Sequence, residues 1–347
     1  MLDHKLSNQT GKLLIDTLLG NKSKKIPIWF MRQAGRYLPE YKKIRESTNS
    51  FLEFCYSPDK ASEVTLQPIK RFDFDAAIIF SDILVIPDAL GMEVRFITNE
   101  GPVLTSIKNE NDVNNLEYDK TKLFPVYEAI NITKTKLEKN KALIGFAGAP
   151  WTLATYMIEG GGSKDYLKTK AFSYQNKKLF TKIIDLLVNS ISKHLIAQIE
   201  AGVDAVQIFD SWAGVLTHEQ FKKYSIDPTA KIVSNIRKIY PNIPIIGFPK
   251  SAGVLYRQYA KETAVNAISF DQYMPASWIK ENIDIPVQGN LDPVLLMTDK
   301  KGAVDSAKRL IDIMQEKAFI FNLGHGILQD TPIENVEAVV REVKNNG

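Results

Sequence analysis

Short hydrophobic runs alternate with helical patterns along most of the chain. Runs rich in Ile, Val and Phe, each bounded by Gly, Pro or a polar residue, fall at 75–80, 143–147, 203–209, 243–248, 265–270, 285–288 and 318–322. Such runs are typical of strands that are buried on both faces of a parallel sheet. The pattern is ambiguous over 84–98, where we place an eighth strand.

The segments between these runs carry helical signals. Hydrophobic residues recur at spacings of three and four from 176 to 201, and Gly202 is placed to end that helix. Polar and proline signals predict three further helix starts, at Thr217 with Gln220, at Asp227-Pro228 and at Thr331-Pro332 with Glu334.

Strands that alternate with helices predict an α/β fold, either a (β/α)8 barrel or an open doubly wound sheet. Periodicity alone does not separate the two, but no Gly-x-Gly-x-x-Gly follows the first strand, which weakens a dinucleotide-binding open sheet. We expect a (β/α)8 TIM barrel, with 1–347 as a single domain and 1–60 as an N-terminal extension that packs on the barrel. Residues 99–122, rich in Asn, Glu and Lys, are expected to form a polar excursion.

Composition narrows the function classes. The 347 residues are 44% hydrophobic and 24% charged, as in a globular protein, and no apolar run approaches the roughly 20 residues of a membrane span. The first twelve residues lack the apolar core of a secretory signal. A single cysteine, Cys55, allows no intramolecular disulfide and no Cys-rich zinc site, so we expect a cytoplasmic protein. A net charge of +4 fits an anionic ligand without implying nucleic acid.

Small and polar residues follow most of the expected strands. They include Ser81-Asp82, Gly148 to Trp151 with Tyr156, Asp210-Ser211, Asp271, Asn290 with Asp292, and His325. Because active sites of barrels lie at the carboxyl ends of the strands, these residues predict one shared pocket. Turns also favour Asp, Asn, Ser and Gly, so each single position is explained as well by a turn.

Two of these residues have an unusual context. Asp82 has apolar sequence on both sides, so we expect a partly buried carboxylate whose partner is either a structural arginine or a ligand. His325 lies between two glycines and is either a turn residue or a ligand-binding or acid–base group. Asp271 and Asp292 are expected to cap helices, and Asp210 fits a cap equally well.

The segment 27–45 concentrates arginine in apolar sequence. Arg32 and Arg36 are four residues apart, directly after Trp29-Phe30-Met31, and Arg45 follows. Like charges at this spacing repel each other on a helix, so an anion or internal acidic partners must favour the arrangement. Guanidinium groups bind carboxylates and phosphates in a bidentate manner, and the apolar surroundings favour an anion clamp over a solvated face.

Several long motifs resemble the uroporphyrinogen decarboxylase family. Residues 27–37 and 145–163 match its two signatures, and 80–84, 288–293 and 322–326 match further family blocks in order. The resemblance covers nearly the whole chain. It implies a (β/α)8 barrel that forms a homodimer and converts the four acetate side chains of uroporphyrinogen III to methyls. It implies neither a metal nor an organic cofactor. The short apolar runs and the dispersed Lys and Arg residues lead us to expect no membrane and no nucleic-acid partner.

The resemblance also implies roles for single residues. Asp82, Arg32 and Arg36 would be catalytic, with Asp82 accepting hydrogen bonds from pyrrole N–H groups and the arginines holding carboxylates. The remaining substrate-binding residues would be Gln33, Ala34, Gly35, Arg45, Phe146, Tyr156, Phe209, Ser211 and His325. The acid that protonates the product carbon stays open between Asp82, Tyr156, His325 and a water molecule.

The sequence departs from the family pattern at three places. Asp271 is followed by Gln272 rather than Trp, the stretch Phe248 to Ser251 is atypical, and Trp212 follows Ser211. These differences concern the rim of the expected pocket rather than its central carboxylate and arginines.

Two other functions are compatible with parts of the sequence. A corrinoid or thiol methyltransferase shares this barrel but holds zinc through His and Cys ligands, and Cys55 has no second cysteine to join it. A non-catalytic protein that binds tetrapyrroles or other polyanions would keep the pocket without turnover. A zinc assay addresses the first alternative and a turnover assay the second.

Overall fold

A curled parallel sheet of seven strands forms the centre of the computed structural model, which describes residues 10–97 and 100–346. The strand order is β1-β4-β5-β6-β7-β8-β9. Each of the seven expected hydrophobic runs overlaps one strand, so these predictions are confirmed. The strands are β1 (Ala76–Ile78), β4 (Ala142–Gly148), β5 (Ala205–Asp210), β6 (Ile245–Pro249), β7 (Ala267–Ser269), β8 (Val287–Leu291) and β9 (Phe319–Leu323).

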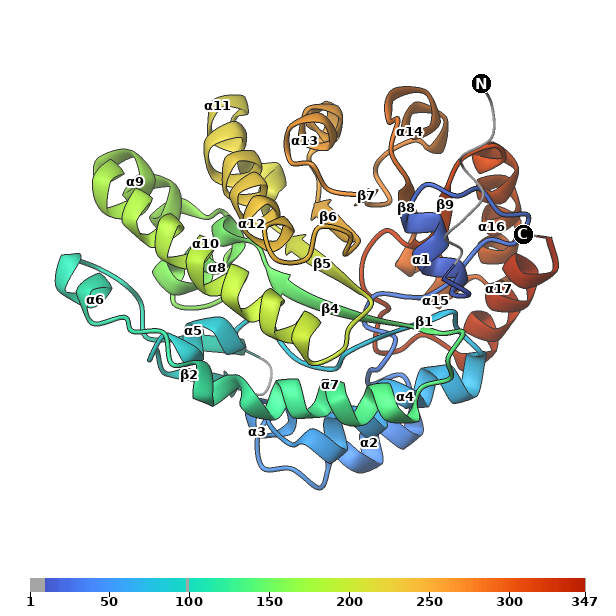
Figure 1. Cartoon of the computed structure of the whole chain (residues 1–347), viewed down its shortest axis with the longest axis horizontal. Coiled ribbons are helices and arrows are strands. Elements are labelled where there is room, and N and C mark those ends of the chain that lie inside the picture. Colours follow the sequence, from blue (N-terminus) through green and yellow to red (C-terminus); the bar gives the residue numbers. More distant parts are fainter. Residues whose placement is uncertain (1–9, 98–99, 347) are drawn as a thin grey trace.

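The eighth strand expected within 84–98 is not part of this sheet. Residues Val85–Ala89 form the short helix α5, since Pro87 lacks the backbone donor that a central strand needs. β2 (Val94–Ile97) pairs antiparallel with β3 (Gly101–Leu104) in a separate hairpin. With α6 (Glu110–Asn114), β2 lies at the end of the molecule opposite α1 and α17 (Figure 1), so the described part of 99–122 forms the predicted excursion.

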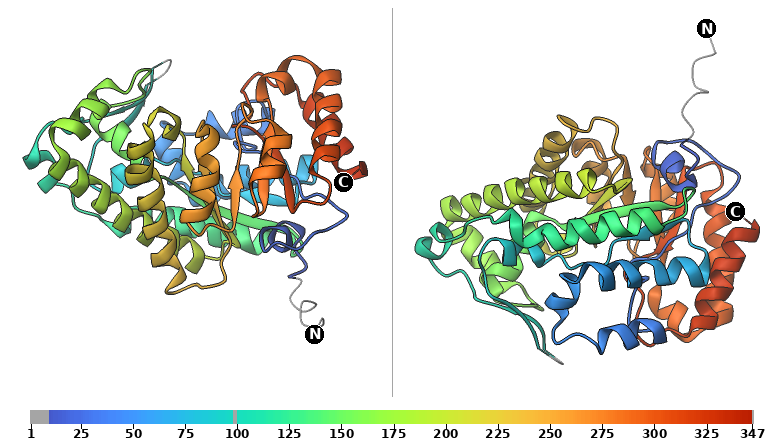
Figure 2. Two further views of the ribbon diagram at one scale, coloured as in Figure 1. Left: turned by 90° about the horizontal axis from the view of Figure 1, so that it is seen from above. Right: turned by 60° about the horizontal axis from the view of Figure 1, so that its bottom comes forward.

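Helices surround the sheet, as the views in Figures 1 and 2 show. The N-terminal part contributes α1 (Leu13–Leu18), α2 (Pro39–Arg45), α3 (Phe51–Cys55) and α4 (Pro58–Phe72). The middle of the chain contributes α7 (Phe124–Lys136), α8 (Pro150–Glu159), α9 (Leu167–Gln175), α10 (Lys177–Glu200), α11 (His218–Phe221) and α12 (Asp227–Arg237). The last part contributes α13 (Tyr256–Glu262), α14 (Ala276–Asn282), α15 (Pro293–Thr298), α16 (Lys300–Met314) and α17 (Ile333–Asn346).

The predicted helix signals are confirmed in part. The long helix α10 ends just before Gly202, whose φ of +114° is open mainly to glycine. The Thr217 side chain caps α11 by accepting the Gln220 N–H. Asp227 does not cap a helix, because a π-helical turn, Lys222–Ile226, joins α11 to α12 without a break. Its carboxylate pairs instead with Lys222.

Side chains fill the concave side of the curled sheet. Residues from β1, β4, β5, β6, β7 and β9 form one apolar cluster there, together with Trp29 and Met31, and Leu14, Ile15 and Leu18 of α1 pack against it. A polar chain runs through the same interior. The Trp29 Nε1–H donates to Gln288 Oε1 over 2.9 Å, and the Gln288 amide donates to Gln207 Oε1 over 3.1 Å. A ligand must therefore bind at an end of the sheet rather than inside it.

Residues 27–29 connect the two edge strands of the sheet. The Trp29 N–H donates to the Phe321 carbonyl on β9 over 3.3 Å, and the Phe321 N–H donates to Pro27 O over 2.9 Å. On the other side, Asp75, just before β1, donates its N–H to Ile28 O and accepts the Ile28 N–H with its carboxylate, both over 2.9 Å. This attachment fixes the direction in which the following Arg32 segment leaves the sheet.

Candidate active site

Asp82 lies on a rigidly anchored turn after β1. The Ile79 N–H donates to Ile144 O on β4, and the Phe80 N–H donates to the Thr65 hydroxyl on α4. Asp82 itself is half-buried and accepts the Leu84 N–H over 2.8 Å. Burial raises the pKa of its carboxyl to about 6, although the Leu84 hydrogen bond and the Arg32 charge oppose that rise. Asp82 is therefore a desolvated carboxylate with unused acceptor capacity.

Arg32 comes from the segment that connects β9 and β1. The Met31 N–H donates to Asn322 Oδ1 over 3.1 Å and the Ile327 N–H donates to Met31 O over 2.9 Å, so the segment is tied to the loop after β9. The Arg32 side chain crosses Gly326, where a Cβ would overlap it. Arg32 has a φ of +61°, which is uncommon outside glycine. Its guanidinium is exposed and, within 10–97 and 100–346, has no hydrogen bond or ion pair.

The other residues of the arginine segment divide into internal and exposed groups. The buried Gln33 side chain accepts the Phe30 N–H and donates to Ala76 O, so it holds the turn against β1. Arg45 donates to both the carbonyl and the hydroxyl of Thr48. Arg36 is exposed, and Ala34 and Gly35 are half-buried. Substrate contacts at these positions stay predictions, and the geometry favours Arg36 over Gln33 and Arg45 as a direct contact.

A row of aromatic rings crosses the ends of three neighbouring strands. The rings of Phe146 on β4 and Phe209 on β5 lie 5.7 Å apart, and Phe209 lies 6.0 Å from Phe248 on β6. The Phe248 ring is 6.3 Å from the His325 imidazole. Phe146 and Phe209 are half-buried, so they present ring surface at the carboxyl ends of the strands. Such a wall suits a flat apolar ring system.

His325 and Tyr156 are both neutral near pH 7. Burial lowers the pKa of His325 to about 3, and the charges of Arg32 and Lys250 act in the same direction. Burial raises the pKa of the Tyr156 hydroxyl to about 12, with a further contribution from Asp82. The Tyr156 ring packs on Trp212 at 4.2 Å, beside the half-buried Ser211. The site therefore combines one carboxylate and exposed cations with neutral hydrogen-bonding groups.

Two aspartates have partners that the sequence did not reveal. Asp210 is buried and accepts the hydroxyls of Thr152 and Ser225 over 2.7 and 2.6 Å. Asp271 was expected to cap a helix, which is wrong, because the N-cap of α14 is Pro275. The buried Asp271 carboxylate instead accepts the Ser251 N–H over 2.6 Å and the Tyr256 hydroxyl over 2.7 Å.

Asp292 does cap α15, as expected, by accepting the Val294 N–H. Lys250 is a further residue that the sequence did not mark as part of the site, although its charge acts on His325. Its only sequence signal was the atypical stretch Phe248 to Ser251.

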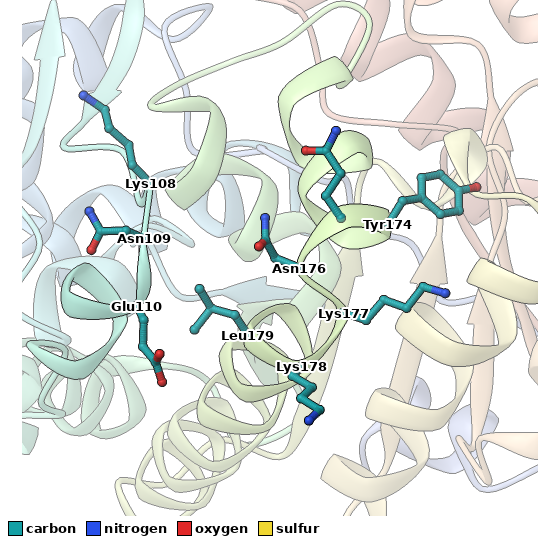
Figure 3. Close-up of a pocket in the computed structure, with 9 residues that line it drawn as sticks. Lys108, Asn109, Glu110, Tyr174, Asn176, Lys177, Lys178 and Leu179 are labelled. Carbon is teal, nitrogen blue, oxygen red and sulfur yellow. The ribbon is translucent and has the colours of Figure 1, made fainter.

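A second recess lies away from these residues. A groove of about 590 Å³ lies between the segment 108–110 and the junction of α9 and α10 at 174–179. Figure 3 shows the side chains that line it. Its lining combines Lys108, Lys177 and Lys178 with the exposed ring of Tyr174. None of the predicted site residues lines this groove, so it is separate from the strand-end site.

Metal-binding clusters and membrane-spanning helices are both absent from the described part of the chain. Within 10–97 and 100–346, no three His, Cys, Asp or Glu side chains lie together in a way that could hold a metal ion. Cys55 is buried in the hydrophobic core, and burial raises the pKa of its thiol. No helix in this part of the chain combines the length and apolar character needed to cross a bilayer.

The fold is that of an α/β protein in which aromatic rings, a carboxylate and exposed arginines lie at the carboxyl ends of the strands. The family model described as "Uroporphyrinogen decarboxylase (URO-D)" matches residues 9–346, and the chain belongs to the uroporphyrinogen decarboxylase family. Uroporphyrinogen decarboxylases of Rickettsia conorii and Rickettsia canadensis are each 50% identical to it. They cover 96% of this chain, and the match spans 96% and 99% of their own lengths.

Two solved structures share this α/β fold at lower sequence identity. A methyltransferase from Methanosarcina mazei aligns with a TM-score of 0.78 at 20% identity, covering 97% of this chain and 99% of its own. A B12-independent methionine synthase from Shewanella sp. W3-18-1 aligns with a TM-score of 0.56 at 9% identity, covering 82% of this chain and 85% of its own. These two likenesses concern the fold alone.

Proposed function

We propose that the chain decarboxylates the four acetate side chains of uroporphyrinogen III to methyls, giving coproporphyrinogen III and four molecules of carbon dioxide in tetrapyrrole biosynthesis. The family match over residues 9–346 and the 50% identity to the Rickettsia enzymes support this activity. The observation that carries it within the site is Asp82, a desolvated carboxylate with free acceptor capacity beside the Arg32 cation.

The substrate itself supplies the electron sink. Protonation of the ring carbon next to the one that bears the acetate turns the pyrrole into a cationic iminium, which is conjugated with the acetate-bearing carbon and takes up the ring electrons at nitrogen. The C–C bond to the carboxylate then breaks, and its electron pair forms an exocyclic double bond as carbon dioxide leaves. A proton finally adds to the exocyclic carbon while the ring carbon loses its own. Asp82, ionised above a pKa of about 6, stabilises the cationic ring and accepts pyrrole N–H groups.

The arginines and the neutral groups have complementary roles. Arg32 and Arg36 hold substrate carboxylates and so fix which acetate faces Asp82. Of the side chains predicted as proton donors, Asp82 has the pKa closest to neutrality, since that of Tyr156 is about 12 and that of His325 about 3. This order favours Asp82, directly or through a water molecule, as the group that moves protons.

The finer features of the architecture belong to the same proposal. The hydrogen bonds of 27–29 to β9 and to Asp75 support this segment as the eighth position of a closed (β/α)8 barrel. In this proposal 1–347 is a single domain, and 1–60 is an N-terminal extension that packs on the barrel and closes it through residues 27–29. We further propose a cytoplasmic homodimer that needs no metal or organic cofactor.

Anaerobic incubation with uroporphyrinogen III, followed by oxidation and chromatography of the porphyrins, tests the function. Stepwise loss of carboxyl groups down to the tetracarboxylate is the expected result. Folded protein that binds the substrate without turnover would contradict the proposal and favour the binding-protein alternative. Zinc in the purified protein, measured by metal analysis, would favour the methyltransferase alternative.

A further inference from the structure

Lys250 lies at the strand ends, next to the residues assigned above. Ile246 and Phe248 on β6 both belong to the interior cluster, and side chains two positions apart in a strand point to the same face. Lys250 is the first residue after β6, in a turn two positions beyond Phe248, whose ring lies 6.3 Å from the His325 imidazole. The Arg32 and Asp271 charges act on Lys250, and the Lys250 charge acts on His325. The ammonium group therefore faces the site that contains Arg32 and His325.

The backbone around Lys250 is anchored on both sides. Its N–H donates to Asp210 O over 3.1 Å, and its carbonyl accepts the Gly214 N–H over 3.0 Å. The next residue, Ser251, has a φ of +61° and donates its N–H to Asp271. A Cβ at Gly214 would lie 2.6 Å from Ser251 O, so the close approach requires glycine there. Such an uncommon conformation, held by surrounding contacts, is typical of functional positions.

The Lys250 side chain itself has no such anchor. It is half-buried, yet across the described residues its Nζ takes part in no hydrogen bond or ion pair. Burial and the Arg32 charge both lower the pKa of the ammonium group, while Asp271 opposes them. A desolvated cation that lacks a partner in a rigid turn is stabilised when an anion binds.

The two cations reach the site from opposite sides. β6 is the middle strand of the sheet, whereas Arg32 follows the segment that contacts the edge strand β9. We propose that Lys250 binds a carboxylate of the substrate and that Asp271 positions it through the Ser251 N–H. This inference rests on the proposed function, because a tetrapyrrole with carboxylates around its whole periphery is the ligand that engages both cations at once.

Steady-state kinetics of Lys250→Met with uroporphyrinogen III test the assignment. Loss of one charge-assisted hydrogen bond to the substrate lowers kcat/KM by about tenfold or more. We expect most of that change in KM, since Lys250 binds a carboxylate rather than the reacting carbon. Lys250→Arg, which keeps the charge, is expected to stay within about threefold of the wild-type value.

Fluorescence titration with coproporphyrin III, a tetracarboxylate, identifies the carboxylate involved. If Lys250 binds a propionate, Lys250→Met weakens this complex as much as it raises the KM for uroporphyrinogen III. If Lys250 binds an acetate, only the octacarboxylate substrate is affected. Both results support the proposal, and an unchanged KM together with an unchanged coproporphyrin affinity overturns it.

Two control variants separate binding from folding. Lys231→Met removes a lysine on α12 that pairs with Asp185 at 3.1 Å on the outer surface, and its KM is expected to be unchanged. Asp271→Asn is expected to raise KM in the same direction as Lys250→Met but less. If Lys250→Met lowers only the melting temperature, the lysine is structural and the proposal fails. Absence of turnover in the wild-type protein would instead refute the proposed function, and fluorescence titrations with uroporphyrin III, an octacarboxylate, and with coproporphyrin III would still decide the role of Lys250.

Discussion

Asp82 and Asp210 are two carboxylates with the same pKa and different surroundings. Asp210 ends β5 and Asp82 follows β1, and burial raises the pKa of each to about 6. Asp210 accepts two hydroxyls, from Thr152 and Ser225. Asp82 accepts one backbone N–H, from Leu84, and faces an arginine without a partner in the described chain. The raised pKa therefore does not identify the functional group, whereas unused acceptor capacity does.

One face of helix α8 interacts with both carboxylates. Thr152 and Tyr156 are one helical turn apart, so their side chains lie on the same side of the helix. Thr152 donates to Asp210, while the Tyr156 hydroxyl has a pKa raised in part by Asp82. Helix α8 thus stabilises the structural carboxylate of Asp210 through Thr152, and it lines the substrate site with Tyr156. The comparison predicts loss of activity on the Asp82 side and loss of stability on the Asp210 side.

Asp82→Asn is expected to have the largest effect of any single change. Removal of a preorganised charge from the reaction centre is expected to lower kcat by about 10³-fold. In other enzymes, loss of one group that stabilises charge in the transition state lowers kcat by a similar factor. Stability should not fall. The folded-state pKa of Asp82 lies above the ordinary value, so the ionised carboxylate disfavours the folded state above about pH 6, and its removal relieves that cost. Kinetics and thermal melts at pH 8 check both parts.

The pH profile provides a second readout of the same prediction. Because the ionised form of Asp82 is the active one, wild-type kcat/KM should fall about tenfold for each pH unit below about 6. The residual activity of Asp82→Asn should lack this decline. A folded variant with wild-type kcat, or one that keeps the decline, would show that Asp82 is not the electrostatic centre.

Arg32→Met is expected to have the second-largest effect. Loss of a bidentate contact to a substrate carboxylate lowers kcat/KM by about 10²-fold. The Arg32 charge also lowers the pKa of Asp82, so the acidic decline of the pH profile should move to higher pH in the variant. Arg309→Met, at an exposed position on α16, is the matched control. An unmoved pH profile would show that Arg32 and Asp82 act independently.

The sequence predicted those parts of the fold that depend on local pattern. Each buried run became a strand because its apolar side chains can be covered on both faces. The failures arose where tertiary contacts decide. Residues 85–89 around Pro87 form α5 rather than a strand, and a π-helical turn leads directly into α12, so Asp227 begins that helix as expected but does not cap it. The contacts of 27–29 with β9 join residues almost 300 positions apart, which no local pattern reveals.

The same distinction applies to the candidate site. Asp82 and Arg32 were recognisable because charged residues rarely occur within apolar sequence unless they have a function or a partner. Asp210 and Asp271 looked like ordinary caps, since their partners on α8, on the π-helical turn and beyond β6 are distant in sequence. Lys250 was marked only by the atypical stretch Phe248 to Ser251 that contains it. Its role depends on its place in a turn that is held by Asp210 and Asp271.

Asp210→Asn is expected to affect stability rather than activity. The amide replaces one acceptor oxygen with a donor, so a buried hydroxyl of Thr152 or Ser225 loses its partner, at a cost of about 1–3 kcal/mol in the free energy of unfolding. Relief of the buried charge offsets part of that loss. Urea denaturation measures the stability, and kcat of the folded variant should stay within about threefold of wild type. A hundredfold loss of kcat at unchanged stability would instead make the two carboxylates equivalent.

The smallest expected effects come from α8, where Tyr156→Phe and Thr152→Val each remove one hydroxyl. A single neutral hydrogen bond contributes about 1 kcal/mol, or about fivefold in an equilibrium or rate constant. Tyr156→Phe should therefore lower kcat/KM by about fivefold and leave the melting temperature unchanged, since its ring still packs on Trp212. Thr152→Val should lower the melting temperature and leave kcat/KM unchanged. Among the described residues, the Thr152 hydroxyl donates to the buried Asp210 carboxylate and accepts the Trp212 N–H. If both variants instead changed the same property, kcat/KM or melting temperature, Tyr156 and Thr152 would not have separate roles. The contrast between Asp82 and Asp210 would then reflect only their distances from the substrate.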